Sequence, residues 1–200
     1  MVDIKLEIAA IAARIVVEEG LDWGAAKRRA VKQLGLPMRS PLPDNSMLEG
    51  QIEEYIALFC ADSQALELKA LRELAMTWMT RLTEFRPYLS GAVWHGTATR
   101  HSDVYLDLYC EDPKAAEIFL INKGVQFEAR EVTSTLGAKA EALSVHCWCE
   151  PFRSYIGLHL FLHDLDDLRG SLQRDARGRS PRGDLEAVRA LMHDDGPYAK

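Results

Sequence analysis

The chain contains 200 residues, of which 48% are hydrophobic and 27% are charged, and its formal net charge at pH 7 is -6. A chain of this length forms one large or two small domains and buries enough apolar surface to fold without a disulfide or metal staple. The negative charge disfavours broad binding to nucleic acids or anionic membranes, although a local basic patch would still bind phosphate groups.

The cysteines and the amino-terminal segment bear on the cellular compartment. The four cysteines are too few and too clustered for the disulfide framework of a small secreted protein, so we expect reduced thiols. Charged residues, among them Asp3, Lys5 and Arg14, interrupt the apolar amino-terminal segment, which argues against a signal peptide or a membrane span. We therefore expect a cytoplasmic protein that does not associate with membranes.

Helical patterns dominate the first 87 residues. Isoleucines at every third or fourth position predict a helix over residues 4–19, which Gly20 ends. Asp22 is the expected N-cap of a second helix that reaches Gly35, and a proline-rich linker follows over residues 36–45.

Two further helices are predicted before Pro87. Ser46 and Glu49 form the pattern of a capping box at the start of the third helix. Apolar residues at helical spacing from Leu71 to Phe85 predict a long fourth helix that Pro87 ends. The sequence leaves open whether the third and fourth helices are separate.

After Pro87 the pattern changes to short strands. Strands are expected at residues 89–95, 103–110, 125–134, 141–149 and 155–163, with a helix that begins at Asp112-Pro113 and ends at Gly124, and a turn at Gly137. The predicted fold class is α+β, in which a helical N-terminal region precedes a mixed, mainly antiparallel sheet with helices on one face.

The tail is expected to form a third part of the chain. Its arginines, which form either a solvated loop or a flexible phosphate clamp, are Arg174, Arg177, Arg179 and Arg182. Ser180 and Pro181 are the expected start of a final helix. The predicted domains are a helical region at 1–87, an α+β domain at 88–163 and a C-terminal basic loop and helix at 164–200.

Two parts of the predicted sheet have one apolar and one ionisable face. Over residues 103–110, alternation places Asp103, Tyr105 and Asp107 together on an exposed or cleft-lining face. If the last two strands form a hairpin, their polar face carries histidines, with His146 opposite His159.

No local signature marks a serine or cysteine nucleophile paired with a histidine.

Residues 91–106 resemble the signature of the DNA polymerase beta-type nucleotidyltransferase superfamily. Gly91 takes the place of the glycine that follows the family's first strand, and Gly96-Thr97-Ala98 matches its second small-residue turn. Ser102-Asp103 matches the serine-aspartate pair that opens the second strand. The resemblance is close over about twenty residues, extends loosely over residues 88–163, and implies a nucleotidyltransferase-like fold.

The resemblance also implies roles for particular residues. The nucleoside triphosphate would be bound by the turn and its neighbours, namely Gly91, Gly96, Thr97, Arg100 and Ser102. Asp103 would bind Mg²⁺ or Mn²⁺, with Asp107 as a further metal ligand on the same face. His146 and His159, on the facing strands, are the other candidate catalytic residues, and Glu150 is an alternative to them.

Two positions depart from the family pattern. Ala92 replaces a residue whose hydroxyl contacts phosphate in the family, and Tyr105 replaces the second metal-binding carboxylate. Asp107 does not simply substitute for position 105, because two residues along a strand span about 6.6 Å.

Three hypotheses about function follow. The chain is a divergent nucleotidyltransferase that moves a nucleotide to a protein, nucleic acid or small-molecule acceptor. Alternatively, it keeps the fold as a binding or regulatory module without catalysis. The third possibility is another, metal-dependent hydrolase on the face of Asp103, His146 and His159. The sequence does not indicate an oligomeric state.

Overall fold

The computed structural model of the chain describes residues 3–133, 139–174 and 178–194. The chain forms two compact units. The first, here called the helical unit, comprises Met1–Leu68 and Thr97–Ser102, and the second, the sheet unit, comprises Lys69–Gly96 and Asp103–Lys200. Residues 69–87, which the sequence grouped with the helical region, thus belong to the sheet unit.

The helical unit is built from α1 (Ile4–Glu19), α2 (Trp23–Gln33), α3 (Asn45–Phe59) and the first turn of α4 (Gln64–Arg81). The predicted end of the first helix and start of the second are confirmed: Gly20 caps α1 with a φ of 69°, and the Asp22 carboxylate accepts from the Ala25 N–H, whereas α2 ends at Gln33, before the predicted Gly35. Its core consists of fully buried apolar side chains, which include Ile8, Ala12, Ile15, Leu48 and Ile52.

The start of α3 differs from the predicted capping box. Asp44 is the N-cap, and its Oδ1 accepts a hydrogen bond from the Met47 N–H at 2.8 Å. Ser46 and Glu49 therefore lie within the helix rather than at its cap. An aspartate in this position satisfies an N–H group that has no partner inside the helix, so the helix begins there.

Replacing Asp44 with alanine is expected to lower the free energy of unfolding by about 1 kcal/mol, because the Met47 N–H loses its acceptor. Asp44→Asn retains a side-chain oxygen at the cap and is expected to lose less than half as much. Urea denaturation followed by circular dichroism measures both variants. Equal losses would show that the charge of Asp44, rather than its hydrogen bond, stabilises the helix.

The sheet unit contains the rest of α4 and a mixed sheet. The predicted long helix ends at Arg81 and is followed by a 3-10 turn at Thr83–Phe85, while residues between Phe59 and Gln64 separate α3 from α4. The strands are β1 (Tyr88–Ser90), β2 (Val104–Cys110), β3 (Glu128–Thr133), β4 (Lys139–Cys149), β5 (Ser154–Asp164) and β6 (Arg182–Gly183).

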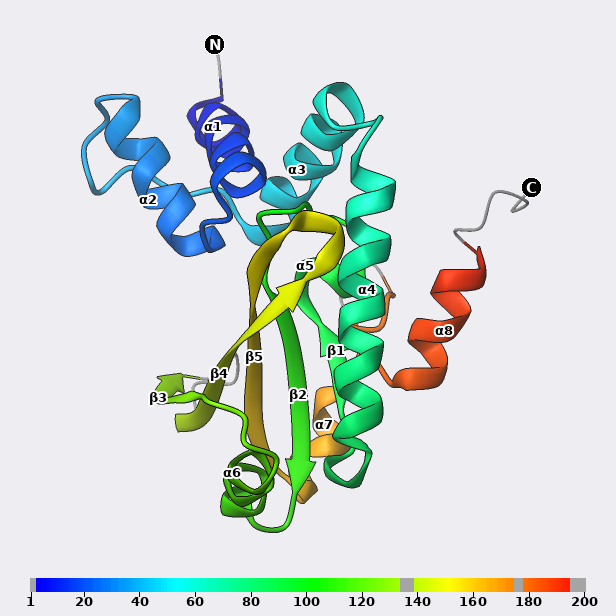
Figure 1. The fold of residues 1–200 in the computed structure, drawn as a ribbon. Helices are drawn as coiled ribbons and strands as arrows, with labels where there is room; N and C mark the ends of the chain where they lie inside the picture. Colours follow the sequence, from blue (N-terminus) through cyan, green and yellow to red (C-terminus); the bar gives the residue numbers. More distant parts are fainter. Residues whose placement is uncertain (1–2, 134–138, 175–177, 195–200) are drawn as a thin grey trace. The chain divides into compact units, whose positions relative to one another are not determined.

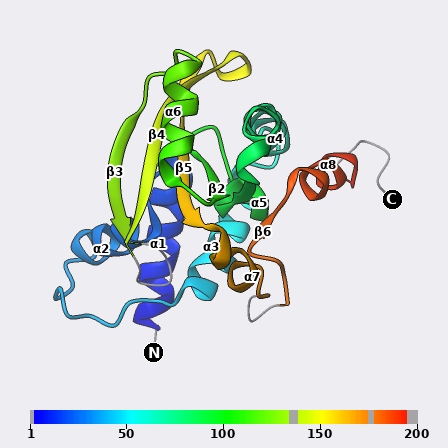
Figure 2. The same cartoon turned by 90° about the horizontal axis from the view of Figure 1, so that it is seen from below.

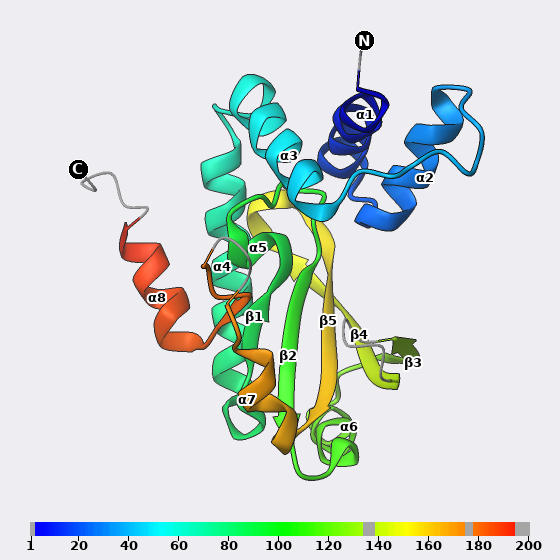
Figure 3. The ribbon, with the colours of Figure 1, turned by 180° about the vertical axis from the view of Figure 1, so that it is seen from behind.

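The strand order is β3-β4-β5-β2-β1-β6. β2 and β5 are parallel, whereas the other neighbouring pairs are antiparallel. Figures 1 and 3 show the two sides of this sheet. The predicted α+β class, with N-terminal helices followed by a mixed, mainly antiparallel sheet, is confirmed.

The sheet has one apolar and one polar face, as the alternation predicted. Its apolar face carries buried side chains such as Leu106, Leu108, Leu143, Cys147, Leu158 and Leu160. Helices α4 and α6 (Pro113–Asn122) cover this face, whereas the short helix α7 (Leu168–Ser171) lies on the opposite side (Figure 2). Cys147 therefore sits in the core, where burial raises the pKa of its thiol to about 11. The four cysteines are unpaired, as expected.

Two predicted elements near the ends of the sheet unit are wrong. The expected strand at 89–95 stops at Ser90, and Gly91, with a φ of 70°, opens a short helix, α5 (Gly91–His95). The final helix, α8 (Leu185–Asp194), begins after β6, and Asp184 accepts from the Ala187 N–H at its start, so Ser180 and Pro181 do not cap it. Trp94 of α5 donates to the Ser180 carbonyl at 2.8 Å, a contact across 86 residues.

Two further expectations, the turn at Gly137 and the position of Arg177, lie outside the described residues. In the part of the chain that the structure describes, no helix is long and apolar enough to cross a membrane.

Candidate functional site

Asp103 lies directly before β2, at the position that the resemblance assigns to it. Its Oδ1 accepts a hydrogen bond from the Gly157 N–H at 3.0 Å, and its Oδ2 lies 3.1 Å from His159 Nε2. The missing side chain of Gly157 makes room for the carboxylate, because a Cβ there would lie 2.7 Å from Asp103 Cγ. The carboxylate thus reaches over β5 while its side chain stays 42% exposed.

His159 connects Asp103 to a serine that the sequence did not single out. Its Nδ1 lies 2.9 Å from the Ser144 Oγ, and the imidazole stacks on the Tyr105 ring at 5.1 Å between centroids. Neighbouring strands supply the residues, since Ser144 of β4 is the register partner of His159 in β5 and Tyr105 of β2 is its partner on the other side. Asp103, His159 and Ser144 therefore form a continuous polar chain across the sheet.

The expected pairing of His146 with His159 is wrong. Glu150–Phe152 forms a 3-10 turn, and Arg153 adopts a φ of 49°, so β4 ends at Cys149 opposite Ser154. The loop thus comes one residue earlier than predicted, which shifts the register by two and places His146 opposite Gly157. Because the shift is even, both histidines keep their predicted face.

His146 is exposed and lines a groove of about 500 Å³ beside β4. Ser144 lines the same groove, and the other lining residues lie at the start of the neighbouring strand β3 and directly before it, namely Val125, Gln126, Phe127 and Glu128. The groove is thus lined by both apolar and polar residues, and Ser144 is one of them.

Tyr105 lies over Gly91. A Cβ on Gly91 would lie 3.3 Å from Cδ2 of the Tyr105 ring, and Ser90 is the register partner of Tyr105. The same ring also stacks with Phe161 at 5.9 Å. An aromatic side chain therefore fills the space beside the glycine where the resemblance would place a metal-binding carboxylate.

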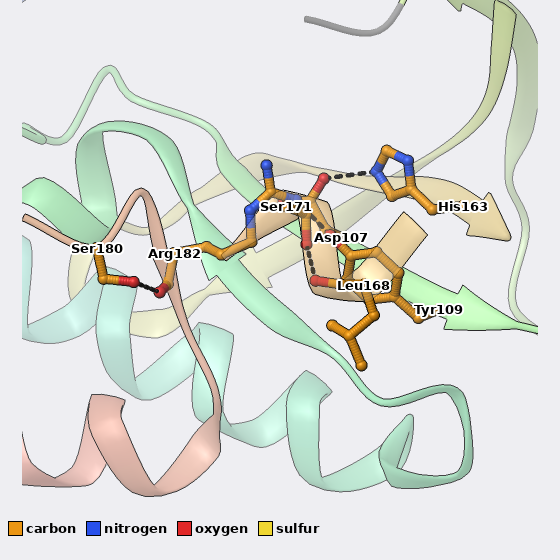
Figure 4. Close-up of polar contacts among 7 residues, drawn as sticks. All are labelled: Asp107, Tyr109, His163, Leu168, Ser171, Ser180 and Arg182. Carbon is orange, nitrogen blue, oxygen red and sulfur yellow. Dashed lines mark hydrogen bonds and ion pairs between the residues drawn. The ribbon is translucent and has the colours of Figure 1, made fainter. Parts of the chain in front are cut away.

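Asp107 is buried rather than exposed, with a residue exposure of 6%. His163 Nε2 lies 2.7 Å from its Oδ1, and Arg182 Nη1 lies 3.2 Å from its Oδ2 (Figure 4). Arg182 also donates to the hydroxyl of Tyr109, which is hydrogen-bonded to Ser171 of α7. Burial raises the pKa of Tyr109, although Ser171 and Arg182 partly oppose this effect. The part of the polar face around Asp107 is therefore covered by residues of the C-terminal tail, which come from α7 and β6.

The expected nucleotide-binding residues are divided between the two units. Gly91 and Gly96 flank α5 in the sheet unit, where Gly96 caps the helix with a φ of 85°. Thr97, Arg100 and Ser102 belong to the helical unit.

Within the helical unit, the turn at Thr97–Ser102 is held by hydrogen bonds within the turn and to residues of α1 and α4. The Thr99 N–H donates to Ser102 Oγ at 3.0 Å, and the Arg100 N–H donates to Glu67 at 2.9 Å. The buried Thr99 hydroxyl donates to the Val17 carbonyl at 3.1 Å. The backbone N–H groups of Thr99 and Arg100 therefore have protein partners in place of the triphosphate that the resemblance implies.

The carboxylates in the sheet unit do not fit a pair of Mg²⁺ or Mn²⁺ ions. Such ions need several convergent oxygen ligands. Asp103 already contacts Gly157 and His159, Asp107 is paired with Arg182, and neutral Tyr105 lies between them. Within residues 3–133, 139–174 and 178–194, no group of three or more His, Cys, Asp or Glu side chains is arranged to hold a metal ion.

The sequence reasoning missed Ser144, Gly157 and Arg182 as partners of the aspartates. Ser144 carried a usable signal, because it shares the alternating polar face of β4 with His146. Gly157 and Arg182 carried none, since each acts through contacts with residues far away in the sequence, 54 positions for Gly157 and Asp103.

Comparisons with known proteins give a partial likeness only. No family model matches the sequence, and no curated protein sequence matches it significantly. A structure of Cid1 with the UTP analogue UMPNPP is 13% identical, with a TM-score of 0.36, over 57% of this chain and 36% of the Cid1 chain. A structure of the Cid1 poly(U) polymerase with MgGTP bound is 15% identical, with a TM-score of 0.37, over 56% of this chain. This chain thus spans little more than a third of the Cid1 chain (36% and 38%).

Proposed function

We propose that the chain is a catalytically degenerate, nucleotidyltransferase-like binding or regulatory protein, which binds a nucleoside triphosphate without transferring the nucleotide. The single observation that carries the proposal is the pairing of Asp107 with Arg182 and His163. A guanidinium group already neutralises the carboxylate that was the best candidate to replace the family ligand missing at Tyr105.

The order of elements supports the relationship to the family. Gly91 follows a strand, and Asp103 opens the next one, as the resemblance requires. The changes lie in the chemistry of the site, since a tyrosine and a histidine stand beside Asp103 where two-metal transfer needs carboxylates. This pattern favours binding over metal-dependent transfer, which remains the alternative.

The ring of Tyr105 is the proposed contact for the nucleotide base. It is partly exposed and stacks with His159 and Phe161, which makes an aromatic surface on the open face of the sheet. A base that stacks on an aromatic side chain gains about 1 to 3 kcal/mol and needs no particular sequence of hydrogen bonds. The acceptor and the oligomeric state play no part in this proposal.

Isothermal titration calorimetry with ATP, GTP, CTP and UTP, each with and without Mn²⁺, tests the binding. We expect at least one of them to bind, with an affinity that changes less than about two-fold on adding Mn²⁺, because no carboxylate cluster holds the ion. Tyr105→Ala should weaken binding by about ten-fold through loss of stacking. Tyr155→Ala, at an exposed tyrosine of the β4–β5 hairpin, is the matched control.

Two results would contradict the proposal. One is the absence of binding of all four nucleotides at about 1 mM, a concentration that detects interactions of about 4 kcal/mol. The other is transfer of radiolabel from an α-labelled nucleotide to the protein or to added RNA, dependent on Mn²⁺ and lost in Asp103→Ala. That second result would establish the divergent nucleotidyltransferase instead.

A further inference from the structure

Ser144, His159 and Asp103 have the connectivity of a nucleophile, a general base and an orienting carboxylate. The Ser144 Oγ to His159 Nδ1 distance is 2.9 Å, and the His159 Nε2 to Asp103 Oδ2 distance is 3.1 Å. We propose that Ser144 is a nucleophile activated by His159, and that this site cleaves small, uncharged carboxylic esters. This proposal is independent of nucleotide binding.

The hydrogen bonds select the reactive tautomer of His159. The carboxylate of Asp103 has no proton to donate when ionised, so the Nε2 atom carries the proton that joins the two groups. Nδ1 then has a free lone pair that faces the Ser144 hydroxyl. The ring is inserted in the opposite sense to the serine protease arrangement, so the two nitrogens exchange roles: here Nδ1 faces the serine and Nε2 faces the carboxylate.

Two neighbouring residues, Gly157 and Tyr105, favour this arrangement. Gly157 leaves the space that the Asp103 carboxylate occupies and also donates its N–H to Oδ1. Tyr105 stacks on the imidazole and fixes the plane of the ring. His159 is held from three sides while its side chain stays 25% exposed, so that it is both oriented and accessible.

The groove beside Ser144 determines the substrate class. Its volume of about 500 Å³ suits a small molecule, and Val125 and Phe127 supply an apolar wall for an acyl or alkyl group. Gln126 and His146 line the same groove and carry N–H groups, which are the type of donor that stabilises the oxyanion of an acyl-transfer intermediate. Glu128 on the wall pairs with Arg130 at 2.8 Å, so the two charges offset each other and the wall suits an uncharged ester.

The reaction balances without a metal ion or a redox partner. The Ser144 oxygen forms a bond to the ester carbonyl carbon while its proton passes to His159 Nδ1, and Asp103 stabilises the resulting imidazolium. The bond to the alcohol oxygen then breaks, and this oxygen takes the proton from Nδ1. Water repeats the sequence on the acyl-serine, which releases the carboxylic acid and restores the Ser144 hydroxyl.

The test uses the full chain with p-nitrophenyl acetate as substrate and an alkyl fluorophosphonate as covalent probe. We expect the probe to modify the peptide that contains Ser144, as located by mass spectrometry. Ser144→Ala should abolish this labelling, and His159→Gln should slow labelling and ester hydrolysis by about 100-fold or more, because general base catalysis contributes at least that factor. Ser154→Ala, at the start of β5, is the matched control and should label at the wild-type rate.

Circular dichroism of each variant separates a loss of reactivity from a loss of fold, and the wild-type peptide map is independent of any substitution. Labelling spread over several serines, or confined to a peptide without Ser144, would overturn the proposal. So would hydrolysis by Ser144→Ala at the wild-type rate. Esterase activity without nucleotide binding would support this inference and contradict the proposed function. Nucleotide binding without esterase activity would support the proposed function and contradict this inference.

Discussion

Replacing Arg182 with alanine is expected to lower the free energy of unfolding by about 3 kcal/mol, the lower end of the range for breaking a buried ion pair. The side chains of Arg182 and Asp107 are only 14% and 8% exposed, so truncation leaves a buried carboxylate without its guanidinium partner. His163 still contacts Oδ1 at 2.7 Å, which keeps the loss at the lower end. The same substitution removes the hydrogen bond from Arg182 to Tyr109. Urea denaturation followed by tryptophan fluorescence gives the measurement.

The control for this prediction is Arg189→Ala in α8. Arg189 pairs with Glu186 on the helix surface, where such pairs contribute about 0.5 kcal/mol or less. A second variant tests the mechanism: Asp107→Leu combined with Arg182→Met should restore stability to within about 1 kcal/mol of wild type. The pair is imperfect, since Arg182 Nε and Asp107 Oδ2 are buried without hydrogen-bond partners among the described residues. If Arg182→Ala costs no more than Arg189→Ala, the pair does not attach the tail to the sheet.

The parts of the fold that depend on neighbouring residues could be predicted from the sequence. Gly20, Asp22 and Asp112 mark helix ends through contacts within a few positions, and all three act as expected. The alternation along β2 likewise identified the apolar face. These features are local because a cap or an alternating strand depends mainly on its own segment.

The burial of Asp107 could not be predicted, because the residues that cover it lie far away in the sequence. Arg182 contacts Tyr109 across 73 positions, and its strand, β6, has two residues and no recognisable pattern.

The register of β4 and β5 was missed for a different reason. It depends on Arg153, which adopts a positive φ that favours glycine, so the sequence did not indicate that the loop would come one residue earlier than predicted.

The sequence therefore predicted which face of the sheet carries the candidate site, but not which residues contact one another there. Asp103, His146 and His159 do share one side of the sheet, but Asp103 contacts His159 and Gly157, and His146 lies at the groove beside Ser144. The assignment of Asp103 to a metal came from the resemblance alone. In the structure, an imidazole nitrogen lies 3.1 Å from its carboxylate, which changes the chemistry that this aspartate supports.

Gly157→Ala is expected to reduce the labelling rate of Ser144 by about 100-fold, to the level expected of a site without its orienting carboxylate. The new Cβ would lie 2.7 Å from both Cγ and Oδ1 of Asp103. Because the clash falls on the end of a partly exposed side chain, the carboxylate can rotate away, at a cost of about 1 kcal/mol in stability. Its movement separates Oδ2 from His159 Nε2, and the imidazole then loses its fixed tautomer.

A structural measurement tests this mechanism separately from reactivity. Long-range proton–nitrogen NMR spectra should show His159 as the Nε2–H tautomer in the wild type and as a mixture in Gly157→Ala. Gly50→Ala is the matched control, because Gly50 lies in the middle of α3 with no atom within 4 Å of the added Cβ. It should stabilise the helix by about 0.5 to 1 kcal/mol and leave the labelling rate and the tautomer of His159 unchanged. A Gly157→Ala protein that labels at the wild-type rate would show that the Asp103 carboxylate does not orient His159.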